Sequence, residues 1–362
     1  MKILAGVAPN NHVLLAMDEV NGLNDLGCEC RIVSYGRNKP DASKLNKFVV
    51  VVLKAFNIVL RLYQYKPDIL YLNSRLEPAA SFRDFLSLLI IKTFYFRKVK
   101  TVIKTHGSDF SVIDNTSFFT QKIMLRFLIK HVDQWLFLSS DEKKQIAAYS
   151  SEFAKKVYLI PNIIDASRCL DPEQVFEKYN IPVDKFKVLF AGRMIKEKGC
   201  FDVMRSIPLL KFRNECVFLF MGNGDDWKEL RMLAQELGIE DCVRFMGFIP
   251  EIESDPIYSG VDLLAFPTYF SEGFPMVLFK SVAVGLPIIT TQIRAAKDFL
   301  SSPQNVLWVN KQSPEMVAVA IQRIFKDRQL RSHMSVNNKE VGKLFSKARV
   351  CKQIKTVFDT LN

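Results

Sequence analysis

Residues 186–199 read FKVLFAGRMIKEKG, and this stretch decides how the chain is organised. Its first six residues form an apolar run typical of a buried strand, and Gly192 marks the turn that ends the run. The segment just before it, residues 165–184, is polar and reads as a connection. A second series of strands and helices therefore starts at residue 186, and the chain has two halves.

Both halves repeat one alternation of short apolar runs with helical patterns of about 10 to 20 residues. The strands expected in the first half are residues 1–7, 28–36, 66–73, 98–107 and 133–140. Those expected in the second half are residues 186–194, 216–224, 242–248, 261–268 and 286–291. Strands and helices that alternate in this way form right-handed βαβ units and parallel, doubly wound sheets. We therefore predict an α/β protein with two such sheets and a cleft between them, where ligands bind at the carboxyl ends of the strands.

The composition is that of an ordinary globular protein of 362 residues, 49% of them hydrophobic and 24% charged. No run approaches the roughly 20 apolar residues that a membrane-spanning helix needs. The first residues lack the order of charged, apolar and small residues that a signal peptide has. The seven cysteines are scattered, without a CxxC pair, which favours free thiols in a reducing compartment. We expect a cytoplasmic protein.

Basic charge is concentrated in residues 37–104, which hold 14 Lys and Arg against 4 Asp and Glu, a net charge of +10. Two apolar stretches, residues 48–63 and 85–100, lie inside this segment. Such a mixture suits a peripheral contact with an anionic membrane. Two ordinary helices that pack on a sheet and carry lysines on their solvent-exposed face would give the same pattern. Nucleic acid is disfavoured as a partner, because no Arg-rich or aromatic recognition motif accompanies the charge.

Two cations follow the strand of the opening stretch. Arg193 and Lys198 stand just past this strand, where a helix begins, so that forked guanidinium donors, a point charge and the helix end all suit a diphosphate. A solvated basic turn is the simpler alternative. Gly222 and Gly224 form a Gly-x-Gly turn around Asn223 after another strand, a weak signal because such turns also merely reverse the chain.

The stretch SEGFP carries the second group of candidate residues. Glu272 lies on a predicted loop, and Gly273, Phe274 and Pro275 open a helix predicted over residues 273–284. The unpaired N–H groups at this helix start can hold an anion, while Glu272 can accept hydrogen bonds from sugar hydroxyls. A glutamate that only caps the helix is the alternative.

In the first half, three polar residues follow strands. His106 stands after a strand and beside Gly107, which is compatible with a tight turn, although a histidine with a structural role in the turn is the alternative. Asn73 and Arg75 follow the neighbouring strand. We expect these side chains at the same carboxyl edge.

Other polar groups give weaker signals. Ser139 and Ser140 also follow a strand, and the acidic cluster EIESD, residues 251–255, is interpreted as a solvated face. The sequence contains no Ser-His-Asp triad, P-loop or HExxH zinc signature. We therefore expect no metal site and no bound cofactor.

Four motifs in this order resemble the retaining glycosyltransferases of GT-B fold that carry an E-x7-E motif (bacterial glycosyltransferase family 4, glycosyl transferases group 1). FAGRMIKEKG looks like the diphosphate-binding element of that family, and VYLIPNIID looks like its interdomain Pro-Asn-x-x-Asp. VRFMGFIP looks like the strand and loop after which the base is held. SEGFPMVLFKSVAVGLPIITT looks like the signature helix with its following strand. The resemblance covers nearly the whole chain.

The resemblance implies a GT-B architecture of two doubly wound Rossmann-like domains facing a central cleft. Residues 1–165 would bind the acceptor, a glycan or a lipid-linked sugar. Residues 166–344 would bind a nucleotide-diphosphate sugar, which is a co-substrate and not a cofactor. Residues 345–362 would form a helix that packs back on the first domain.

The resemblance also assigns roles to residues. Arg193 and Lys198 would neutralise the leaving diphosphate, Glu272 would hydrogen-bond the donor sugar, and His106 would contact that sugar near its reacting face. The donor-binding positions are Gly192, Gly222, Asn223, Gly224, Gly273, Phe274, Pro275 and Lys280. The acceptor-side positions are Asn10, Asn11, His12, Asn73 and Arg75. Stabilisation of the leaving diphosphate carries most of the catalysis, so neither a metal nor a protein acid–base pair is required.

The chain departs from the family in two places. Asn10 and Asn11 replace a Gly-Gly loop after the first strand, which implies a narrower or differently shaped acceptor site with His12 beside it. Lys280 replaces the second motif Glu, which accepts hydrogen bonds from the ribose hydroxyls. A Lys ammonium has donors only and cannot copy that role, unless it donates to ribose oxygens or pairs with a nearby carboxylate. Lys280 is therefore the substitution to reverse first.

The expected function is transfer, with retention, of a hexose or N-acetylhexosamine from a nucleotide-diphosphate sugar to a glycan or lipid-linked acceptor. The expected setting is cell-surface polysaccharide or glycolipid synthesis at the inner face of a bacterial cytoplasmic membrane. A non-catalytic partner subunit or glycan-binding protein of the same fold is the alternative from another class. A sugar-nucleotide epimerase or a phosphorylase is a third reading, but the carboxylates or the cofactor lysine that it needs are not identified.

Overall fold

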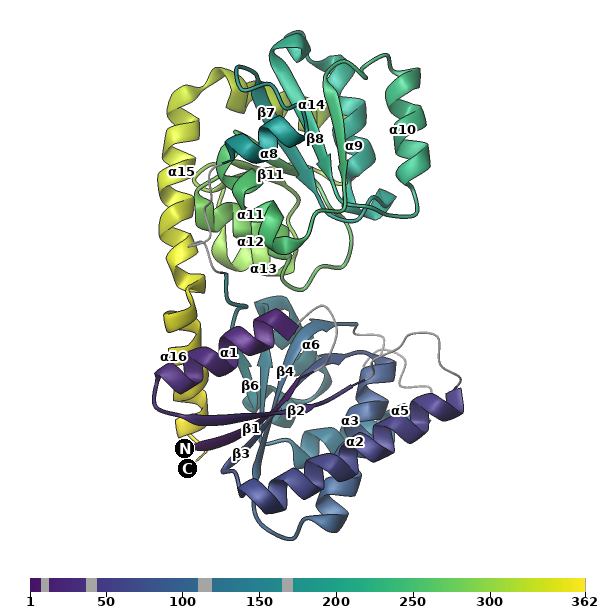
Figure 1. Ribbon diagram of the computed structural model, residues 1–362, viewed down its shortest axis with the longest axis vertical. Coiled ribbons are helices and arrows are strands. Elements are labelled where there is room, and N and C mark those ends of the chain that lie inside the picture. Colours follow the sequence, from purple (N-terminus) through teal and green to yellow (C-terminus); the bar gives the residue numbers. More distant parts are fainter. Residues whose placement is uncertain (8–12, 37–43, 110–118, 165–171, 362) are drawn as a thin grey trace. The chain divides into compact units, whose positions relative to one another are not determined.

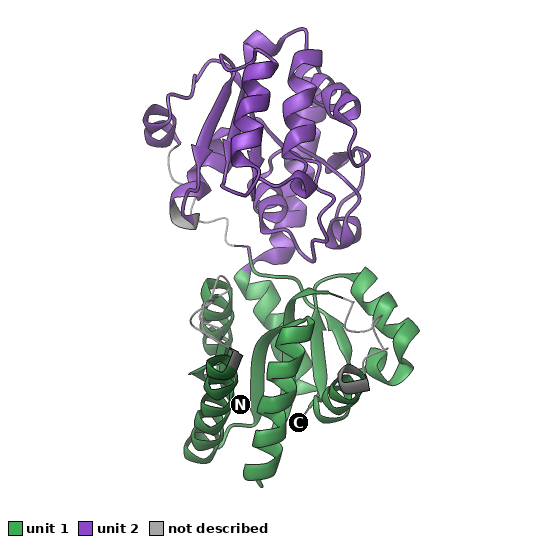
Figure 2. Ribbon diagram, turned by 90° about the vertical axis from the view of Figure 1, so that its right-hand side faces the viewer, with its two compact units in different colours: residues 1–163, 347–362 green, residues 164–346 purple. Residues whose placement is uncertain are grey.

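The computed structural model describes residues 1–7, 13–36, 44–109, 119–164 and 172–361. The chain folds into two compact units, residues 1–163 together with 347–362, and residues 164–346 (Figure 2). Asn10, Asn11 and His12 lie outside the described residues.

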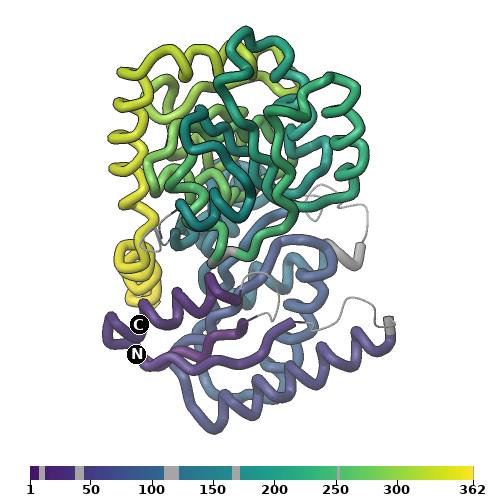
Figure 3. The backbone as a smooth tube through the Cα atoms, turned by 45° about the horizontal axis from the view of Figure 1, so that its top comes forward, coloured from purple at the N-terminus to yellow at the C-terminus, as the bar shows by residue number. Residues whose placement is uncertain are grey.

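The N-terminal unit is built on a six-stranded parallel sheet in the order β2-β1-β3-β4-β5-β6. The strands are β1 (Lys2–Val7), β2 (Glu29–Ser34), β3 (Ile69–Leu76), β4 (Lys100–Ser108), β5 (Gln134–Phe137) and β6 (Val157–Leu159). The helices are α1 (Val13–Asp25), α2 (Lys44–Tyr65), α3 (Pro78–Phe94), α5 (Phe119–His131), α6 (Ser140–Tyr149), α7 (Ser151–Lys155) and α16 (Lys347–Asp359). The chain ends marked N and C lie close together in this unit (Figures 1 and 3).

The two faces of this sheet are covered by different helices, because successive strand residues point to opposite sides. Leu70 and Leu72 of β3 belong to a buried cluster that α2, α3 and α5 cover. Ile69 and Tyr71, which alternate with them, belong to a cluster that α1 and α16 cover (Figure 1). Burial on both faces explains why these strands read as continuous apolar runs in the sequence.

The C-terminal unit repeats the plan with a six-stranded parallel sheet in the order β12-β11-β10-β7-β8-β9. The strands are β7 (Phe186–Ala191), β8 (Cys216–Met221), β9 (Val243–Gly247), β10 (Leu263–Phe266), β11 (Ile288–Thr290) and β12 (Val306–Trp308). The helices are α8 (Glu173–Lys178), α9 (Cys200–Ser206), α10 (Trp227–Glu236), α11 (Glu251–Gly260), α12 (Met276–Val284), α13 (Arg294–Phe299), α14 (Pro314–Lys326) and α15 (Arg328–Gly342). The predicted α/β class and the two parallel, doubly wound sheets are confirmed.

Some elements differ from the prediction. The helix expected over residues 273–284 begins at Met276, because Pro275 before it has an extended backbone with ψ near 109°. The pattern did not predict β6 or β12, since three residues are too few to establish a period of two. Helix α8 lies within the polar segment that was interpreted as a connection.

The last helix of the chain, α16, packs against α1 of the N-terminal unit. A Cβ atom at Gly22 of α1 would lie 2.4 Å from Sγ of Cys351 of α16, so the two helices touch at a position where only glycine fits. The Phe358 ring meets the Tyr71 ring edge-on, with centroids 5.3 Å apart. The face of the sheet that α1 leaves open is thereby closed by residues from the far end of the chain.

A buried ion pair holds this side of the unit together. The Lys104 ammonium of β4 pairs with the Glu19 carboxylate of α1, and both side chains are at most 1% exposed. Tyr71 donates its hydroxyl to the other oxygen of Glu19 at 2.7 Å, and Lys104 also donates to the carbonyl of Pro161 at 3.1 Å. Each charge has a partner, which a buried charge requires.

We expect Lys104→Met to lower the free energy of unfolding by about 3 kcal/mol or more, since it leaves the Glu19 carboxylate buried without its partner charge. Urea denaturation followed by circular dichroism measures this. The double variant Lys104→Met, Glu19→Leu should lose much less, because both charges leave together. Equal losses in the single and double variants would contradict a pairing role.

Candidate functional site

The turns that follow β7, β8 and β9 approach one another at glycines. The N–H of Gly192 donates to the carbonyl of Met221 at 3.0 Å, and the N–H of Gly222 donates to the carbonyl of Gly247 at 2.7 Å. Gly222 has a φ of +133°, and a Cβ atom there would lie 1.9 Å from the carbonyl oxygen of Gly192. No side chain fits at this point, so the turns are locked together by their backbones.

The Gly-x-Gly turn after β8 also supports the turn that carries Arg193. The N–H of Met194 donates to the carbonyl of Asn223 at 3.0 Å, and a Cβ atom at Gly224 would lie 2.4 Å from the carbonyl oxygen of Met194. The glycines singled out in the sequence thus have a clear packing role at the carboxyl edge of the sheet.

The turn after β7 packs in turn on the loop after β10. A short 3-10 turn, Lys196–Lys198, ends at Gly199, whose φ is +81° and whose Cβ would lie 2.4 Å from the carbonyl oxygen of Pro267. The N–H groups of Tyr269 and Phe270 both donate to the carbonyl of Glu197 at 2.8 Å. Loops that are far apart in the sequence are therefore fixed against each other.

This contact brings the Lys198 ammonium onto the Glu272 carboxylate as an ion pair between residues 74 positions apart. The two side chains are only 10% and 16% exposed. Burial lowers the pKa of Lys198, the Glu272 carboxylate opposes that shift, and the Arg193 charge adds to it. The sequence predicted both residues for the site, and the structure places them in direct contact.

Phe270 joins the cations of this site and was missed by the sequence analysis. The Lys198 ammonium lies 4.5 Å and the Arg193 guanidinium carbon 4.9 Å from the centroid of its ring. An aromatic face attracts cations, so Phe270 helps to hold two like charges near each other. Phe270 could have been identified from the sequence by its position two residues before Glu272, on a loop that follows a strand.

The residues before α12 divide their roles between side chain and backbone. The Phe274 side chain is buried, and its ring stacks on Phe279 with centroids 3.8 Å apart. Pro275 directly precedes the helix, which starts at Met276. Since Phe274 faces the core, only the backbone of the Gly273–Pro275 stretch is left for a ligand.

Lys280 pairs with Asp255 of the neighbouring helix α11. The ammonium lies 2.8 Å from Oδ1 of Asp255, and the two side chains are 14% and 12% exposed. The interpretation of residues 251–255 as a solvated face is therefore wrong for Asp255. Pairing of Lys280 with a nearby carboxylate was one of the alternatives expected from the sequence, but Asp255 could not be named as the partner, since the two residues lie 25 positions apart and on different helices.

At the carboxyl edge of the N-terminal sheet, His106 and Asn73 form a buried pair. Nε2 of His106 lies 2.6 Å from Oδ1 of Asn73, which fits an Nε2–H that donates to the amide oxygen. Nδ2 of Asn73 has no hydrogen-bond partner among the described residues. Arg75 is half-exposed, forms a 3.5 Å ion pair with Glu77, and lies against the backbone of Gly107. The expected approach of these strand-end side chains is observed.

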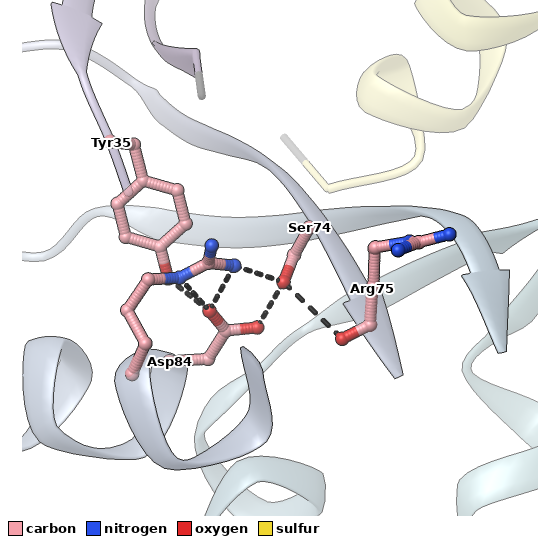
Figure 4. A network of polar contacts seen from close by, with 5 residues as sticks. Tyr35, Ser74, Arg75 and Asp84 are labelled. Carbon is pink, nitrogen blue, oxygen red and sulfur yellow. Dashed lines mark hydrogen bonds and ion pairs between the residues drawn. The ribbon is translucent and has the colours of Figure 1, made fainter. Parts of the chain in front are cut away.

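A second polar network lies at the ends of β2 and β3 and was not predicted. Tyr35 donates its hydroxyl to Oδ1 of Asp84 at 2.5 Å, and Ser74 donates to the other oxygen of that carboxylate (Figure 4). Arg83 binds Asp84 through Nε at 2.9 Å and lies over the Tyr35 ring. Burial, together with the Asp84 charge, raises the pKa of Tyr35 well above its ordinary value.

Ser139 has a local structural role. It caps α6 in a capping box with Glu142, whose carboxylate accepts hydrogen bonds from the N–H groups of Leu138 and Ser139 and from the hydroxyl of Ser108. The described residues contain no group of three or more His, Cys, Asp and Glu side chains that could hold a metal ion. None of the helices described here is both long and apolar enough to cross a membrane.

Residues 171–341 match the family model of glycosyl transferases group 1. An uncharacterized glycosyltransferase of Methanocaldococcus jannaschii is 26% identical over 48% of this chain and 45% of its own length. A second one from that organism is 21% identical over 85% of this chain and 79% of its own length. The capsular polysaccharide biosynthesis glycosyltransferase CapM of Staphylococcus aureus is 25% identical over 53% of this chain. The matched region spans about half the length of CapM and of the first relative.

Solved structures share the fold over almost the whole chain. A glycosyltransferase from Rickettsia africae has a TM-score of 0.81 at 18% identity, with 99% of this chain and 98% of that chain covered. Anabaena HepE, solved in complex with UDP and glucose, has a TM-score of 0.76 at 16% identity, with 99% and 100% covered. At these identities the likeness establishes the GT-B fold.

We expect Lys280→Glu to lower the free energy of unfolding by about 2 kcal/mol or more, because it replaces an ion pair with two facing carboxylates. The exchange variant Lys280→Glu, Asp255→Lys should recover most of the loss, which thermal and urea denaturation measure. Reversing Lys280 alone is therefore a poor test of nucleotide binding. A fully stable Lys280→Glu variant would show that the pair contributes nothing.

Proposed function

The chain belongs, through residues 171–341, to the family of glycosyl transferases group 1, and on this premise we propose that it moves a sugar from a nucleotide-diphosphate donor to an acceptor with retention of anomeric configuration. The proposed donor sugar is a hexose or N-acetylhexosamine. The proposed acceptor is a glycan or a lipid-linked saccharide of cell-surface polysaccharide or glycolipid synthesis. Relatives such as CapM and a lipopolysaccharide core biosynthesis glycosyltransferase of Rhizobium meliloti support this setting.

One observation carries the proposal: Arg193, Lys198 and Glu272 gather on turns that backbone contacts fix at the carboxyl edge of the C-terminal sheet. In the proposed mechanism the two cations bind the donor diphosphate. Negative charge grows on this group as its bond to the sugar breaks, and cations that are already in place stabilise it without reorganisation. No protein group has to protonate the leaving diphosphate.

The ion pair between Lys198 and Glu272 suits an exchange of partners when the donor binds. The diphosphate oxygens would take the ammonium, and the carboxylate would then accept hydrogen bonds from sugar hydroxyls. Burial disfavours the charged form of Lys198, and an incoming dianion would offset that effect as Glu272 does now. Before the donor binds, the pair thus offsets the cost of burying the Lys198 charge.

In the N-terminal unit, we propose that His106 contacts the reacting face of the donor sugar and that Asn73 orients the imidazole ring of His106. The hydrogen bond from Nε2 to the Asn73 amide fixes which ring nitrogen is protonated. Nδ2 of Asn73 remains available to donate to an oxygen of the acceptor or sugar. Arg75, half-exposed at the same edge, would face an anionic acceptor.

The pair of Lys280 and Asp255 supports altered recognition of the nucleotide. Lys280 offers donors only, but the carboxylate beside it restores an acceptor at the same place. We propose that ribose hydroxyls are bound by the two residues together. The role of the missing second Glu would then be divided between α11 and α12.

We place the protein at the inner face of the cytoplasmic membrane, in peripheral contact through the basic segment 37–104. An enzyme can use a membrane-bound acceptor only if it reaches the bilayer. Basic charge near the surface of the protein favours contact with anionic lipid. The proposal includes no metal and no cofactor.

Lys280 stands where the E-x7-E motif has its second Glu, and this difference favours one alternative function. The alternative is a non-catalytic subunit that binds a glycan or a sister transferase. The two candidates differ in nucleotide binding. A ligand that binds only the folded state raises the melting temperature, so a set of UDP, GDP, ADP and CMP separates them. A non-catalytic subunit that has lost the site would respond to none of the four.

We expect Lys198→Ala to reduce sugar transfer by about 100-fold or more, since it removes a preorganised charge from the leaving diphosphate. Transfer of radiolabel from UDP-, GDP-, ADP- and CMP-sugars to membrane extract measures this. The matched control is Lys196→Ala on the same turn, where the ammonium is half-exposed and pairs with Glu229 at 3.0 Å. Lys196→Ala should retain near-native transfer, and equal losses in both variants would contradict the assignment.

A further inference from the structure

Helix α2 carries a stripe of large apolar side chains on its outer face. Spacings of three and four residues place them in one row along a helix of 22 residues. These exposed residues are Leu45, Val49, Leu53, Phe56, Leu60 and Tyr63. The row is unusual because a helix packed on a sheet normally presents polar residues to solvent.

The stripe continues onto the end of α3. The rings of Phe56 and Phe94 lie 5.2 Å apart, and the Tyr63 hydroxyl donates to the carbonyl of Phe94 at 2.9 Å. Phe96, just past α3, is 84% exposed. Helices α2 and α3 lie side by side (Figure 1), and we call the exposed apolar residues of α2, together with Phe94 and Phe96, the apolar ridge.

A shallow hollow that Phe96 also lines lies beside the ridge, at the amino ends of β3, β4 and β5. Its cations are Lys92, Arg97, Lys98, Lys100 and Lys130, and its carboxylates are Asp68 and Asp133, which leaves a net charge of +3. We call this surface the basic hollow. It lies at the opposite edge of the sheet from His106 and is therefore separate from the proposed reaction site.

The two carboxylates of the basic hollow are already engaged. Asp68 accepts a hydrogen bond from the N–H of Lys2 at 2.7 Å, and Asp133 accepts one from the N–H of Thr101 at 2.8 Å. Burial lowers the pKa of His131 in the hollow, and the neighbouring Lys92 and other lysines lower it further. Within the hollow Lys100 also pairs with Asp133 at 3.7 Å, and the other cations still leave the hollow with a net positive charge.

We propose that the apolar ridge and the basic hollow together bind an anionic bilayer, with the ridge in the interfacial layer and a lipid phosphate in the hollow. This rests on the membrane contact proposed above and assigns it to two defined surfaces. Apolar side chains flanked by cations match the two layers that an anionic membrane presents. A second copy of this chain is a poorer occupant, because an isologous contact would bring two positively charged hollows together.

The test is sedimentation of the full-length protein with vesicles of phosphatidylcholine, with and without phosphatidylglycerol. We expect binding only to the anionic vesicles, weakened by salt. The hollow variant Lys92→Gln, Lys98→Gln, Lys130→Gln should bind on the order of 100-fold more weakly, at a factor of about five per charge. The ridge variant Leu53→Ser, Leu60→Ser should bind roughly tenfold more weakly.

The matched controls carry the same changes on exposed residues of the C-terminal unit. They are Lys211→Gln, Lys228→Gln, Lys326→Gln for charge and Leu209→Ser, Val319→Ser for apolar surface. Both controls should bind vesicles as the unmodified protein does. Equal losses in a control and its test variant would overturn the assignment to α2 and the hollow.

Further outcomes separate this proposal from the proposed function. Equal binding to both kinds of vesicle would overturn the role of the hollow. Self-association that the ridge variant abolishes, without vesicle binding, would overturn the membrane as occupant. The rise in melting temperature with nucleotide should be the same in all variants. A failure of vesicle binding with intact nucleotide binding therefore overturns this inference and the proposed membrane contact, but not the proposed sugar transfer.

Discussion

The candidate site depends on a steric constraint: three turns at one edge of the C-terminal sheet approach more closely than any Cβ atom would allow. Gly222 rests on the carbonyl of Gly192, Gly224 on the backbone of Met194, and Gly199 on Pro267. Because backbone touches backbone, these turns have little freedom, and the cations they carry have little either. Fixed charges are the kind that stabilise a leaving group without the cost of reorganising around it.

Two lysines of the C-terminal unit are paired with carboxylates of the same unit. The buried Lys198 pairs with Glu272, and the half-buried Lys280 pairs with Asp255. A buried charge without a partner is costly. A ligand that separates such a pair therefore has to supply a compensating charge or hydrogen bonds to each of the two groups. A diphosphate with its sugar can do this for the first pair, since it supplies an anion and hydroxyl donors together. Selectivity for a whole sugar nucleotide over a bare phosphate follows from that double requirement.

The sequence predicted the parallel sheets well because strands buried on both faces give continuous apolar runs. It also placed Arg193, Lys198, Glu272 and His106 near the ends of strands. These placements needed no knowledge of contacts between distant residues, because each follows from the apolar run that precedes the residue. Contacts across the fold were beyond it: Asp255 lies 25 positions from Lys280, and Asp84 lies 49 positions from Tyr35. The capping box of Ser139 and Glu142, by contrast, has a local S-x-x-E signature and could have been recognised.

The return of α16 to the first unit has a consequence for biosynthesis. Residues 347–361 are synthesised long after the strands of the N-terminal sheet, yet they cover the Tyr71 side of that sheet. Until then the groove beside Gly22 stays open, and apolar residues of that cluster face solvent. The N-terminal unit therefore cannot close its core until α16 has been made, whereas the C-terminal unit is complete at Ser346.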